Sequence, residues 1–352
     1  MTLAAKPDIL PSSSSGSSAQ LAALLDRVGV SPLENTGWLR VTGEDRVRWL
    51  NGMVTNSIQQ LQPGEGNYNF FLSVQGRIQG DAYIFAEPDA LLIETASEQL
   101  TNLMTLLDRF IIMDDVALEN VTANQTGLSI SGPHAASLLQ QIGLPIESLT
   151  PIERQKFPWK TAHITVIHAY SPLIPHFELW ADAAVIASLT QTILAAGATS
   201  CDPLSREWLR ILEGTPLYGI DIRDRELPQE TAQTRALHFA KGCYLGQEIV
   251  ERIRSRGNVH RTFAAFRLEG TLSASGALLE SEGKQVGELT SVATIPLPER
   301  VVQLALGYIR REALDRTSPL QYPGGTATPV SLPYLDPEAQ KHPPASESSE
   351  RV

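Results

Sequence analysis

The densest group of reactive side chains lies at residues 241–248, Lys-Gly-Cys-Tyr-Leu-Gly-Gln-Glu. Cys243 precedes a predicted helix and follows Lys241 by two residues, and both the helix dipole and the ammonium favour a thiolate. Glu248 acts in the opposite direction. A thiolate is a nucleophile and a metal ligand, so this stretch could carry thiol chemistry. The alternative is that Cys243 is a small buried apolar side chain. The two glycines, Gly242 and Gly246, let the backbone approach a ligand or another segment closely.

A run of basic side chains follows this stretch, in a chain whose formal net charge is −11. Its members are Arg252, Arg254, Arg256, His260 and Arg261. Guanidinium groups bind carboxylates and phosphates through paired N–H donors. The run could therefore recognise a polyanionic small molecule, a phosphate backbone or a carboxylate tail. The alternative, a solvated helix face, stays open.

Two carboxylates stand in distinctive surroundings. Asp81 follows Gly-Arg-Ile-Gln-Gly at 76–80, and Glu230 ends Leu-Pro-Gln-Glu on a long loop. Either could act as an acid or base, or be an ordinary charge at a strand edge or a surface turn. The seven histidines show no metal-ligand spacing, and Cys201 and Cys243 form no C-x-x-C pair. We therefore expect no metal site.

The composition is that of a globular protein with two or three domains, since the chain has 352 residues and 42% hydrophobic content. The negative net charge argues against a general nucleic-acid binder. Two free cysteines fit a reducing compartment. The N-terminus has no apolar region typical of a secretory signal, and no apolar run approaches the roughly 18 residues of a membrane helix. We expect a cytoplasmic protein.

Hydrophobic periodicity predicts the elements that position these residues. Helices are expected over residues 20–28, 43–53, 98–110, 133–142 and 184–196, and from Asp202 onward. Strands are expected over 37–43, 116–122, 127–131, 164–168 and 177–181, and within the β-rich stretch 67–95. This order indicates α+β layers rather than a doubly wound parallel sheet. A long irregular loop at 214–233 leads into residues 241–248, and such a loop is usually functional or disordered.

The character of the chain changes after Arg261. Short strands separated by Gly and Pro turns are expected over 262–268, 277–280, 286–292, 304–309 and 328–332. This pattern predicts a small all-β domain, a barrel. The first 20 residues and residues 336–352 are polar and rich in Ser or Pro, so both are expected to be disordered tails.

Residues 241–248 resemble the K-G-C-[FY]-x-G-Q-E signature of the YgfZ-type folate-binding proteins. These belong to the superfamily of the glycine-cleavage T protein, an aminomethyltransferase. Further stretches resemble motifs of that superfamily and occur in the same order. They are residues 41–45 with 50–56, residues 72–78 with Asp81, and residues 131–133, 208–211, 214–216 and 228–230. The resemblance covers roughly residues 35–335.

The resemblance implies a T-protein-like cloverleaf. Two ferredoxin-like α+β domains and a C-terminal small β-barrel would surround a folate-sized central cavity. The implied parts are a tail at 1–20, a discontinuous folate-binding α+β domain at 21–62 and 124–260, an inserted α+β domain at 63–123, a barrel domain at 261–335 and a tail at 336–352.

The resemblance also implies a function. The protein would bind tetrahydrofolate, or a polyglutamylated derivative, and serve in assembly or repair of iron–sulfur clusters, including those of tRNA-modifying enzymes. Cys243 would be the reactive thiol, and Asp81 would stand where T proteins place their catalytic aspartate. The implied folate-binding residues are Glu230, Lys241, Tyr244, Gln247, Arg252, Arg254 and Arg261.

The implied partners are folate and iron–sulfur client or assembly proteins, with no membrane and no strong nucleic-acid binding expected. The sequence departs from the aminomethyltransferases, which lack the cysteine of the signature and carry paired aspartates where this chain has Gly80-Asp81. Two alternatives stay open. One is a folate-dependent one-carbon (aminomethyl) transferase, and the other is a non-enzymatic RNA- or protein-binding scaffold.

Overall fold

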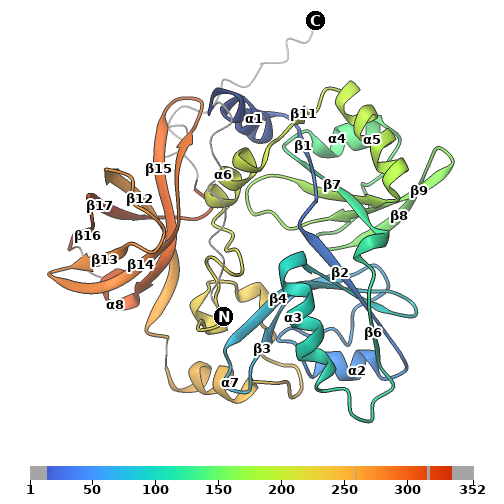
Figure 1. Ribbon diagram of the computed structural model, residues 1–352, viewed down its shortest axis with the longest axis horizontal. Helices are drawn as coiled ribbons and strands as arrows, with labels where there is room; N and C mark the ends of the chain where they lie inside the picture. The colour runs from blue at the N-terminus through green and yellow to red at the C-terminus, as the bar shows by residue number, and fades with distance from the viewer. Residues whose placement is uncertain (1–13, 258, 315–317, 335–352) are drawn as a thin grey trace, which may run out of the picture.

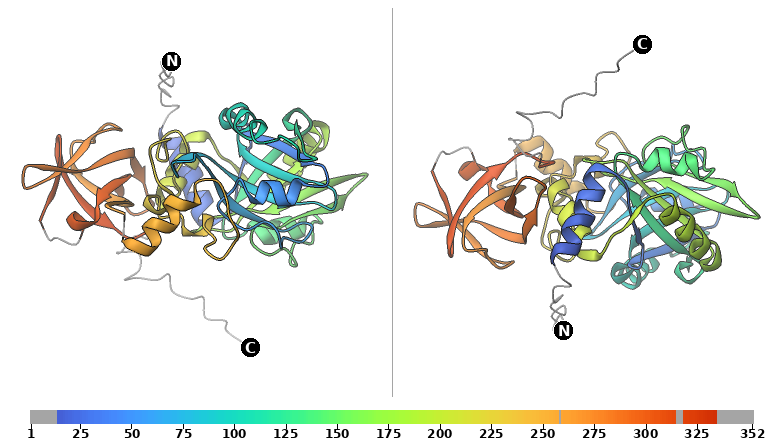
Figure 2. Two further views of the ribbon diagram at one scale, coloured as in Figure 1. Left: turned by 90° about the horizontal axis from the view of Figure 1, so that it is seen from below. Right: turned by 90° about the horizontal axis from the view of Figure 1, so that it is seen from above.

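The computed structural model describes residues 14–257, 259–314 and 318–334. Three units lie around a central segment that runs from α6 (Pro203–Glu213) to α7 (Gln247–Arg256) (Figure 1). Two units are sheets covered by helices, and the third is a closed barrel. Views from below and above show the barrel on one side of the central segment and the sheets on the other (Figure 2). The predicted α+β fold with a C-terminal barrel is confirmed.

The first unit is a six-stranded sheet of order β11-β1-β7-β10-β9-β8. Its strands are β1 (Gly29–Pro32), β7 (Thr126–Ser131), β8 (Arg154–Trp159), β9 (Ala162–His168), β10 (His176–Ala181) and β11 (Thr199–Ser200). The helices α4 (Ala135–Gln141) and α5 (Ala183–Ala195) belong to the same unit. Ile186, Leu189 and Ile193 recur at helical spacing on α5, and all three are buried in the core of this sheet.

The second unit is a five-stranded sheet of order β3-β4-β5-β2-β6. Its elements are β2 (Thr36–Thr42), α2 (Arg46–Asn51), β3 (Gly66–Leu72), β4 (Ile78–Ala86), β5 (Leu91–Ala96), α3 (Ser97–Asp108) and β6 (Ala117–Asn120). The apolar face of α3 is buried in the core of this sheet. β2 precedes residue 63, where the inserted domain is predicted to begin, yet it pairs with β5 and β6. The domain division remains a proposal, and this pairing favours an inserted unit that begins at β2.

The third unit is a closed barrel of order β12-β15-β14-β13-β16-β17. Its elements are β12 (Arg261–Gly270), β13 (Leu278–Ser281), β14 (Lys284–Pro296), β15 (Val301–Arg310), α8 (Arg311–Leu314), β16 (Leu320–Tyr322) and β17 (Gly325–Val330). Alternate residues along β12 and β15 point into a shared core that contains Phe266, Leu289 and Ala305. The prediction lacked β16, because a three-residue strand between prolines shows too little alternation.

The central segment begins with α6, whose ends follow from the sequence. Asp202 caps the helix by accepting the backbone N–H of Ser205 at 2.8 Å, Pro203 takes the first turn, and Gly214 ends the helix at φ 70°. The buried face of α6 packs against α1 (Ser14–Asp26) and against β14 and β15 of the barrel. The remaining elements of the segment are the short turns η2 (Pro228–Glu230) and η3 (Thr234–Ala236), followed by α7.

Two predictions need correction. Residues 14–20, predicted as part of a tail, form the first turns of α1, where Ser17 is buried and its hydroxyl donates to Asp202. Apolar contacts of the later turns hold this helix in place. The polar composition of its first residues does not predict those contacts. Residues 1–13 and 335–352 lie outside the described residues. The edge strand β8 was also missed, because Pro158 argues against a strand although an edge position tolerates it.

Candidate functional site

Asp81 lies within β4, and both of its carboxylate oxygens accept hydrogen bonds. The hydroxyl of Tyr68 on β3 donates to Oδ2 at 2.5 Å, and the amide of Gln99 on α3 donates to Oδ1 at 2.7 Å. Gln99 also accepts the backbone N–H of Asp81 at 3.0 Å. Burial raises the pKa of Asp81 above its usual value, although the two donors counteract part of this rise. The carboxyl group is therefore held in one orientation and binds its proton more tightly than an ordinary aspartate.

Arg235 on η3 reaches into the same neighbourhood. Its guanidinium carbon lies 4.0 Å from the ring centroid of Tyr68 and 3.7 Å from that of Tyr170. One guanidinium nitrogen donates to the hydroxyl of Tyr83 at 2.7 Å, and Nε donates to Gln233 at 3.1 Å. These contacts join the two sheets, since Tyr68 and Tyr83 lie in one and Tyr170 follows β9 of the other. We call residues Tyr68, Asp81, Tyr83, Gln99, Tyr170 and Arg235 the central cluster.

Solvent reaches the central cluster although it lies deep between the units. Asp81, Tyr83, Tyr170 and Arg235 are all partly exposed. Burial nevertheless raises the pKa of Asp81, and it raises the pKa of nearby Tyr218 to about 12. These side chains are therefore packed against one another and still reach solvent. Within the described part of the chain, no ion pair joins Asp81 to Arg235, although their attraction offsets part of the rise in the aspartate pKa.

Lys241 is fixed by the loop that follows α2. Its ammonium donates to the backbone carbonyls of Asn51 at 2.8 Å, Val54 at 2.7 Å and Asn56 at 2.6 Å. Burial lowers the pKa of Lys241 to about 7. A neutral amine has only two N–H groups, so three short contacts favour the ammonium. Lys241 therefore anchors residues 241–248 to the body of the protein, and its three donors are already used there.

Other bonds join the same two segments, residues 51–56 and 235–245. They run from Leu245 N to Gly52 O (2.9 Å), from His238 N to Thr55 O (3.2 Å), from the Thr55 hydroxyl to Ala236 O (2.6 Å) and from the Asn56 amide to Arg235 O (2.9 Å). Two stretches that resemble family motifs and lie far apart in the sequence are thus neighbours. Together they place the backbone of Arg235.

The two glycines of residues 241–248 differ in their surroundings. Gly246 has φ +80°, and a Cβ there would lie 2.6 Å from the carbonyl oxygen of Ser73. Gly76 has φ +72°, and a Cβ there would lie 2.7 Å from Cβ of Ile249 on α7. The start of α7 therefore packs directly on the turn between β3 and β4. Gly242 meets no atom within 4 Å, so the expected close approach of chain segments holds for Gly246 but not for Gly242.

Cys243 is exposed, which excludes the alternative that it is a buried apolar side chain. Cys201 is buried, and burial raises the pKa of its thiol to about 11. Tyr244 is buried in the core formed with β3, and Gln247 accepts the backbone N–H of Tyr244 at 3.3 Å. Tyr244 and Gln247, both predicted to bind folate, therefore also stabilise their own turn. Cys243 is the nucleophile of this stretch that stays open to solvent.

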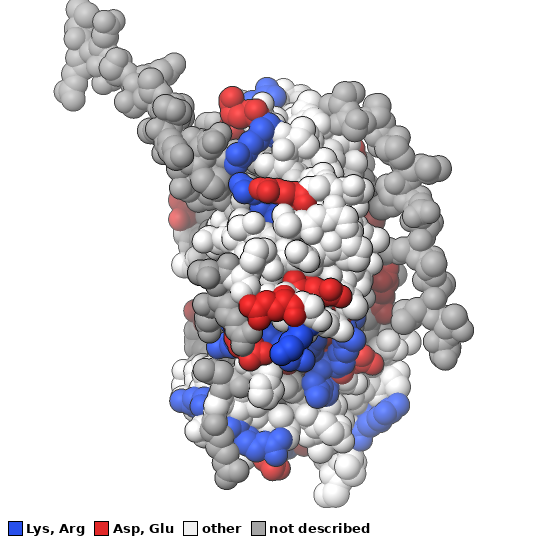
Figure 3. All heavy atoms as spheres, turned by 90° about the vertical axis from the view of Figure 1, so that its left-hand side faces the viewer, with Lys and Arg blue, Asp and Glu red and all other residues white. Residues whose placement is uncertain are grey.

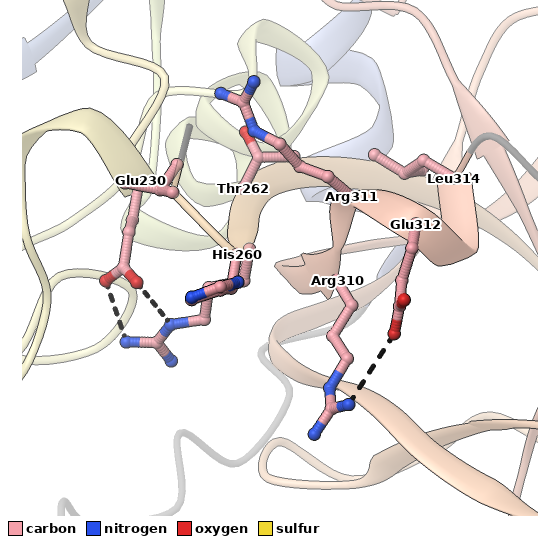
Figure 4. A pocket seen from close by; sticks show the side chains of 9 residues that line it. Glu230, His260, Thr262, Arg310, Arg311, Glu312 and Leu314 are labelled. Atoms are coloured by element: carbon pink, nitrogen blue, oxygen red, sulfur yellow. Dashed lines mark hydrogen bonds and ion pairs between the residues drawn. The ribbon is translucent and has the colours of Figure 1, made fainter. Parts of the chain in front are cut away.

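Glu230 and Arg261, two further predicted folate-binding residues, bind each other. The guanidinium donates to both carboxylate oxygens at 3.0 Å and also approaches Glu226 at 3.4 Å. The pair borders a cavity of about 880 Å³ between the central segment and the barrel. Figure 4 shows the Glu230 carboxylate aimed at its guanidinium partner, and Arg310 reaching toward Glu312. Glu230 therefore pairs with Arg261, and no contact joins it to Asp81 among the described residues.

The rest of the basic run lies on α7. Arg252 and Arg254 are exposed, and Arg254 lies 4.6 Å from the ring centroid of Phe239, whose carbonyl it contacts at 3.3 Å. The side chain of Arg256 lies outside the described part. The run therefore does not form one patch, because Arg261 belongs to a carboxylate cluster while the other two point into solvent.

Charges on the barrel side of the molecule are largely paired. Arg223 and Arg225 contact Glu226 and Glu288, with the shortest distance being 2.6 Å between Arg225 and Glu288. Basic and acidic side chains lie next to each other on this face (Figure 3). A phosphate backbone is bound by a continuous row of unpaired cations. On this face, positively and negatively charged side chains lie beside one another instead.

Of the residues in the central cluster, sequence reasoning predicted only Asp81. Tyr68, Gln99, Tyr83, Tyr170 and Arg235 were not predicted as site residues. Only Arg235 left a weak signal, as a lone arginine six residues before Lys241.

No helix in the described ranges is long and apolar enough to cross a membrane. Within the same ranges, no group of three or more His, Cys, Asp or Glu side chains is arranged to hold a metal ion.

Comparisons with known proteins agree with this architecture. Residues 11–241 match the family described as the GCVT N-terminal domain. A putative chloroplastic transferase of Arabidopsis thaliana is 25% identical over 94% of this chain and 76% of its own length. An aminomethyltransferase of Geobacillus kaustophilus is 26% identical over 81% of this chain and 80% of its own. The crystal structure of glycine cleavage system aminomethyltransferase T from Bartonella henselae superposes with TM-score 0.79 at 17% identity, covering 91% of this chain and 89% of the other. The predicted T-protein-like fold is confirmed.

Proposed function

Because the chain belongs to the family of the GCVT N-terminal domain, we propose that it binds tetrahydrofolate at the central cluster. The observation that carries this proposal is that Asp81 and Arg235, two groups of opposite charge, both contact Tyr68, while no ion pair joins them among the described residues. Aromatic faces and a small number of convergent polar groups are typical of a site for a flat polar ligand. The residues present fit a folate.

The residues of the cluster would each have a distinct role. A bound tetrahydrofolate would supply the nitrogen atoms that can carry a one-carbon unit. Asp81, oriented by Tyr68 and Gln99, would hold or release a proton at its carboxylate. The tyrosine rings would exclude water, and Arg235 would supply a fixed positive charge. The implied roles of Glu230, Lys241, Tyr244 and Gln247 remain proposals, and the contacts of these four residues suit support of the site better than direct binding.

The experiment that tests folate binding is calorimetry with tetrahydrofolate and with its triglutamate. We expect saturable binding of both ligands, and a loss of affinity in Asp81→Ala. If the glutamate tail of the ligand contributes to affinity, the triglutamate should bind more tightly than tetrahydrofolate itself. Arg252 and Arg254 are exposed on α7, so Arg254→Ala should remove that difference and leave monoglutamate binding unchanged if the tail runs along this helix. Absence of binding to either ligand would refute the proposal.

The finer function that we propose is that of a cytoplasmic, YgfZ-type accessory protein for iron–sulfur cluster assembly or repair. The octapeptide at 241–248 and the exposure of Cys243 support it. Complementation of a strain that lacks such a factor tests it, read out as the activity of an iron–sulfur enzyme that modifies tRNA. Cys243→Ala should fail to restore activity while it folds and binds folate, and Cys201→Ser serves as the control. If Cys243→Ala complements like the unmodified protein, the thiol has no such role.

Two alternative functions are each favoured by a specific observation. The similarity to aminomethyltransferases favours a one-carbon transferase in which Asp81 acts as acid or base. Incubation with an aminomethyl donor and tetrahydrofolate, followed by detection of methylene-tetrahydrofolate, would decide this. The exposed arginines of α7 favour a scaffold that binds RNA or protein. RNA affinity that falls steeply with salt would support the scaffold, whereas salt-insensitive folate binding without RNA retention would not.

A further inference from the structure

The guanidinium of Arg235 is held by two aromatic rings and by a hydrogen bond to a third tyrosine. Its Cζ atom lies 4.0 Å from the ring centroid of Tyr68 and 3.7 Å from that of Tyr170, and Tyr83 accepts a hydrogen bond from one nitrogen at 2.7 Å. The backbone carbonyl of the residue is itself bound by the Asn56 amide. A planar cation stacked in this way keeps a fixed orientation. Arg235 is thus a preorganised charge rather than a mobile surface arginine.

Part of this guanidinium has no acceptor among the described residues. Nε donates to Gln233 and one terminal nitrogen donates to Tyr83, while the other terminal nitrogen makes no hydrogen bond within the described part of the chain. The side chain is partly exposed, so these N–H groups are available to a ligand. Tyr68 connects them to the carboxylate, because its ring stacks on the guanidinium and its hydroxyl binds Asp81. The cation and the carboxylate therefore lie on either side of the Tyr68 side chain, within reach of one ligand.

A fixed cation in a partly desolvated site discriminates between ligands by charge. It favours a ligand that presents an oxygen acceptor to the unpaired N–H groups, because a charge-assisted hydrogen bond then forms. It disfavours a second positive charge, because like charges repel more strongly where water is scarce. Folates differ in this respect: a formyl group carries a carbonyl oxygen, whereas a methyl or aminomethyl group offers no oxygen and leaves a basic nitrogen.

We propose that Arg235 is a specificity-determining residue that donates to the oxygen of a one-carbon unit at the formyl level, and so selects a formyl-bearing folate over one that carries a methyl or aminomethyl group. This inference rests on the proposed folate site at the central cluster and deepens it. It names the form of the ligand and assigns a role to a residue outside the signature at 241–248.

The test is calorimetry with 5-formyl-tetrahydrofolate and 5-methyl-tetrahydrofolate, which differ only in the group on one nitrogen. The unmodified protein should bind the formyl compound at least about tenfold more tightly, the size of one charge-assisted hydrogen bond. Arg235→Met keeps an unbranched side chain without charge or donors, and should reduce the preference to within about threefold. A purely structural role would weaken both ligands alike and leave the ratio unchanged. Arg267→Met, on the barrel and paired with Glu269, is the control.

Each outcome of this experiment supports or overturns the proposed role of Arg235 or the folate site itself. If the unmodified protein binds neither compound, the proposed folate site itself fails. If it binds both without a preference, or prefers the methyl compound, folate binding stands and the role of Arg235 is overturned. The same holds if Arg235→Met retains the preference, or if it binds both compounds more tightly, which would make Arg235 an obstruction. Should Arg235→Met fail to fold, Arg235→Lys keeps the charge without the planar fork and should retain part of the preference.

Discussion

Residues 241–248 and the central cluster use their polar groups in opposite ways. In the first region, Lys241 donates to three backbone carbonyls and Gln247 accepts from its own turn. In the second, Asp81 and Arg235 both contact Tyr68, and no ion pair joins them among the described residues. The region that makes the sequence recognisable is therefore largely structural, apart from its exposed thiol. The region with unused hydrogen-bonding capacity is assembled from residues far apart in the chain.

This difference distinguishes polar residues that stabilise the fold from polar residues that bind a ligand or act in catalysis. A polar side chain whose donors all meet backbone carbonyls contributes to stability, and its loss leaves those carbonyls unsatisfied. A charged group that lies in a deep site without a partner costs stability and is retained for binding or catalysis. Substitutions in residues 241–248 should therefore lower the free energy of unfolding, and substitutions in the central cluster should lower ligand affinity instead.

The largest effect on stability is expected for Lys241→Met. The change removes three hydrogen bonds and leaves the carbonyls of Asn51, Val54 and Asn56 without their donor. We expect a loss of about 3 kcal/mol in the free energy of unfolding, measured by urea denaturation. Lys284→Met, at an exposed site in the barrel, should change it by less than about 0.5 kcal/mol. Equal stability of Lys241→Met and the unmodified protein, combined with lost folate binding, would reverse the assignment and make Lys241 a ligand-binding residue.

The next effect is expected from a matched pair of glycine substitutions. Gly246→Ala places a Cβ against the carbonyl oxygen of Ser73 at a residue with φ +80°, whereas Gly242→Ala enters open space. We expect a loss of about 2 kcal/mol for the first and less than about 0.5 kcal/mol for the second. Thermal and urea unfolding of both variants provide the measurement. Similar losses in the two variants would mean that the close packing of α7 on the β3–β4 turn does not matter for stability.

Much of the fold could be predicted from local patterns. The ends of α6 follow from Asp202, Pro203 and Gly214, and the strands of the barrel follow from alternation and turn residues. The short or proline-containing strands β8 and β16 could not be predicted, because their local pattern conflicts with or falls below the usual signal. The start of α1 was missed because tertiary contacts, rather than composition, hold it in place.

The central cluster could be predicted only at Asp81. The proximity of Tyr68 to Asp81 depends on the register of β3 against β4, which shifts at a bulge between Phe71 and Leu72. Arg235 reaches the cluster because residues 51–56 hold its backbone, which is a contact between distant segments. Neither fact has a periodic signature in the sequence. The recognised motifs located the scaffold of the site, and the register and long-range contacts supplied the residues that line it.

A smaller effect of opposite sign is expected for Asp81→Asn. Burial raises the folded-state pKa of Asp81, so its stabilising contribution is fully present below the unfolded pKa and is lost as pH rises through the folded pKa. The Asn oxygen keeps the bond from Gln99, and its amide nitrogen replaces the other bond by donating to the Tyr68 hydroxyl, without the charge. At pH 7 the variant should therefore equal the unmodified protein or exceed it by up to about 1 kcal/mol, and this margin should vanish at pH 4. Folate affinity should fall. Lower stability at pH 7 than at pH 4, relative to the unmodified protein, would contradict this account.

The smallest effect on stability, and the largest on reactivity, is expected at the two cysteines. Cys243 is exposed, whereas Cys201 is 5% exposed and burial raises the pKa of its thiol to about 11. A disulfide reagent at pH 7.5 should therefore modify Cys243 at least about a hundredfold faster than Cys201 in the folded protein, because the thiolate reacts and must be accessible. Cys243→Ser should change the free energy of unfolding by less than about 0.5 kcal/mol. Equal rates at the two thiols in the native protein, or a marked loss of stability in Cys243→Ser, would show that Cys243 belongs with the structural residues of 241–248 and not with the groups that the fold leaves free to react.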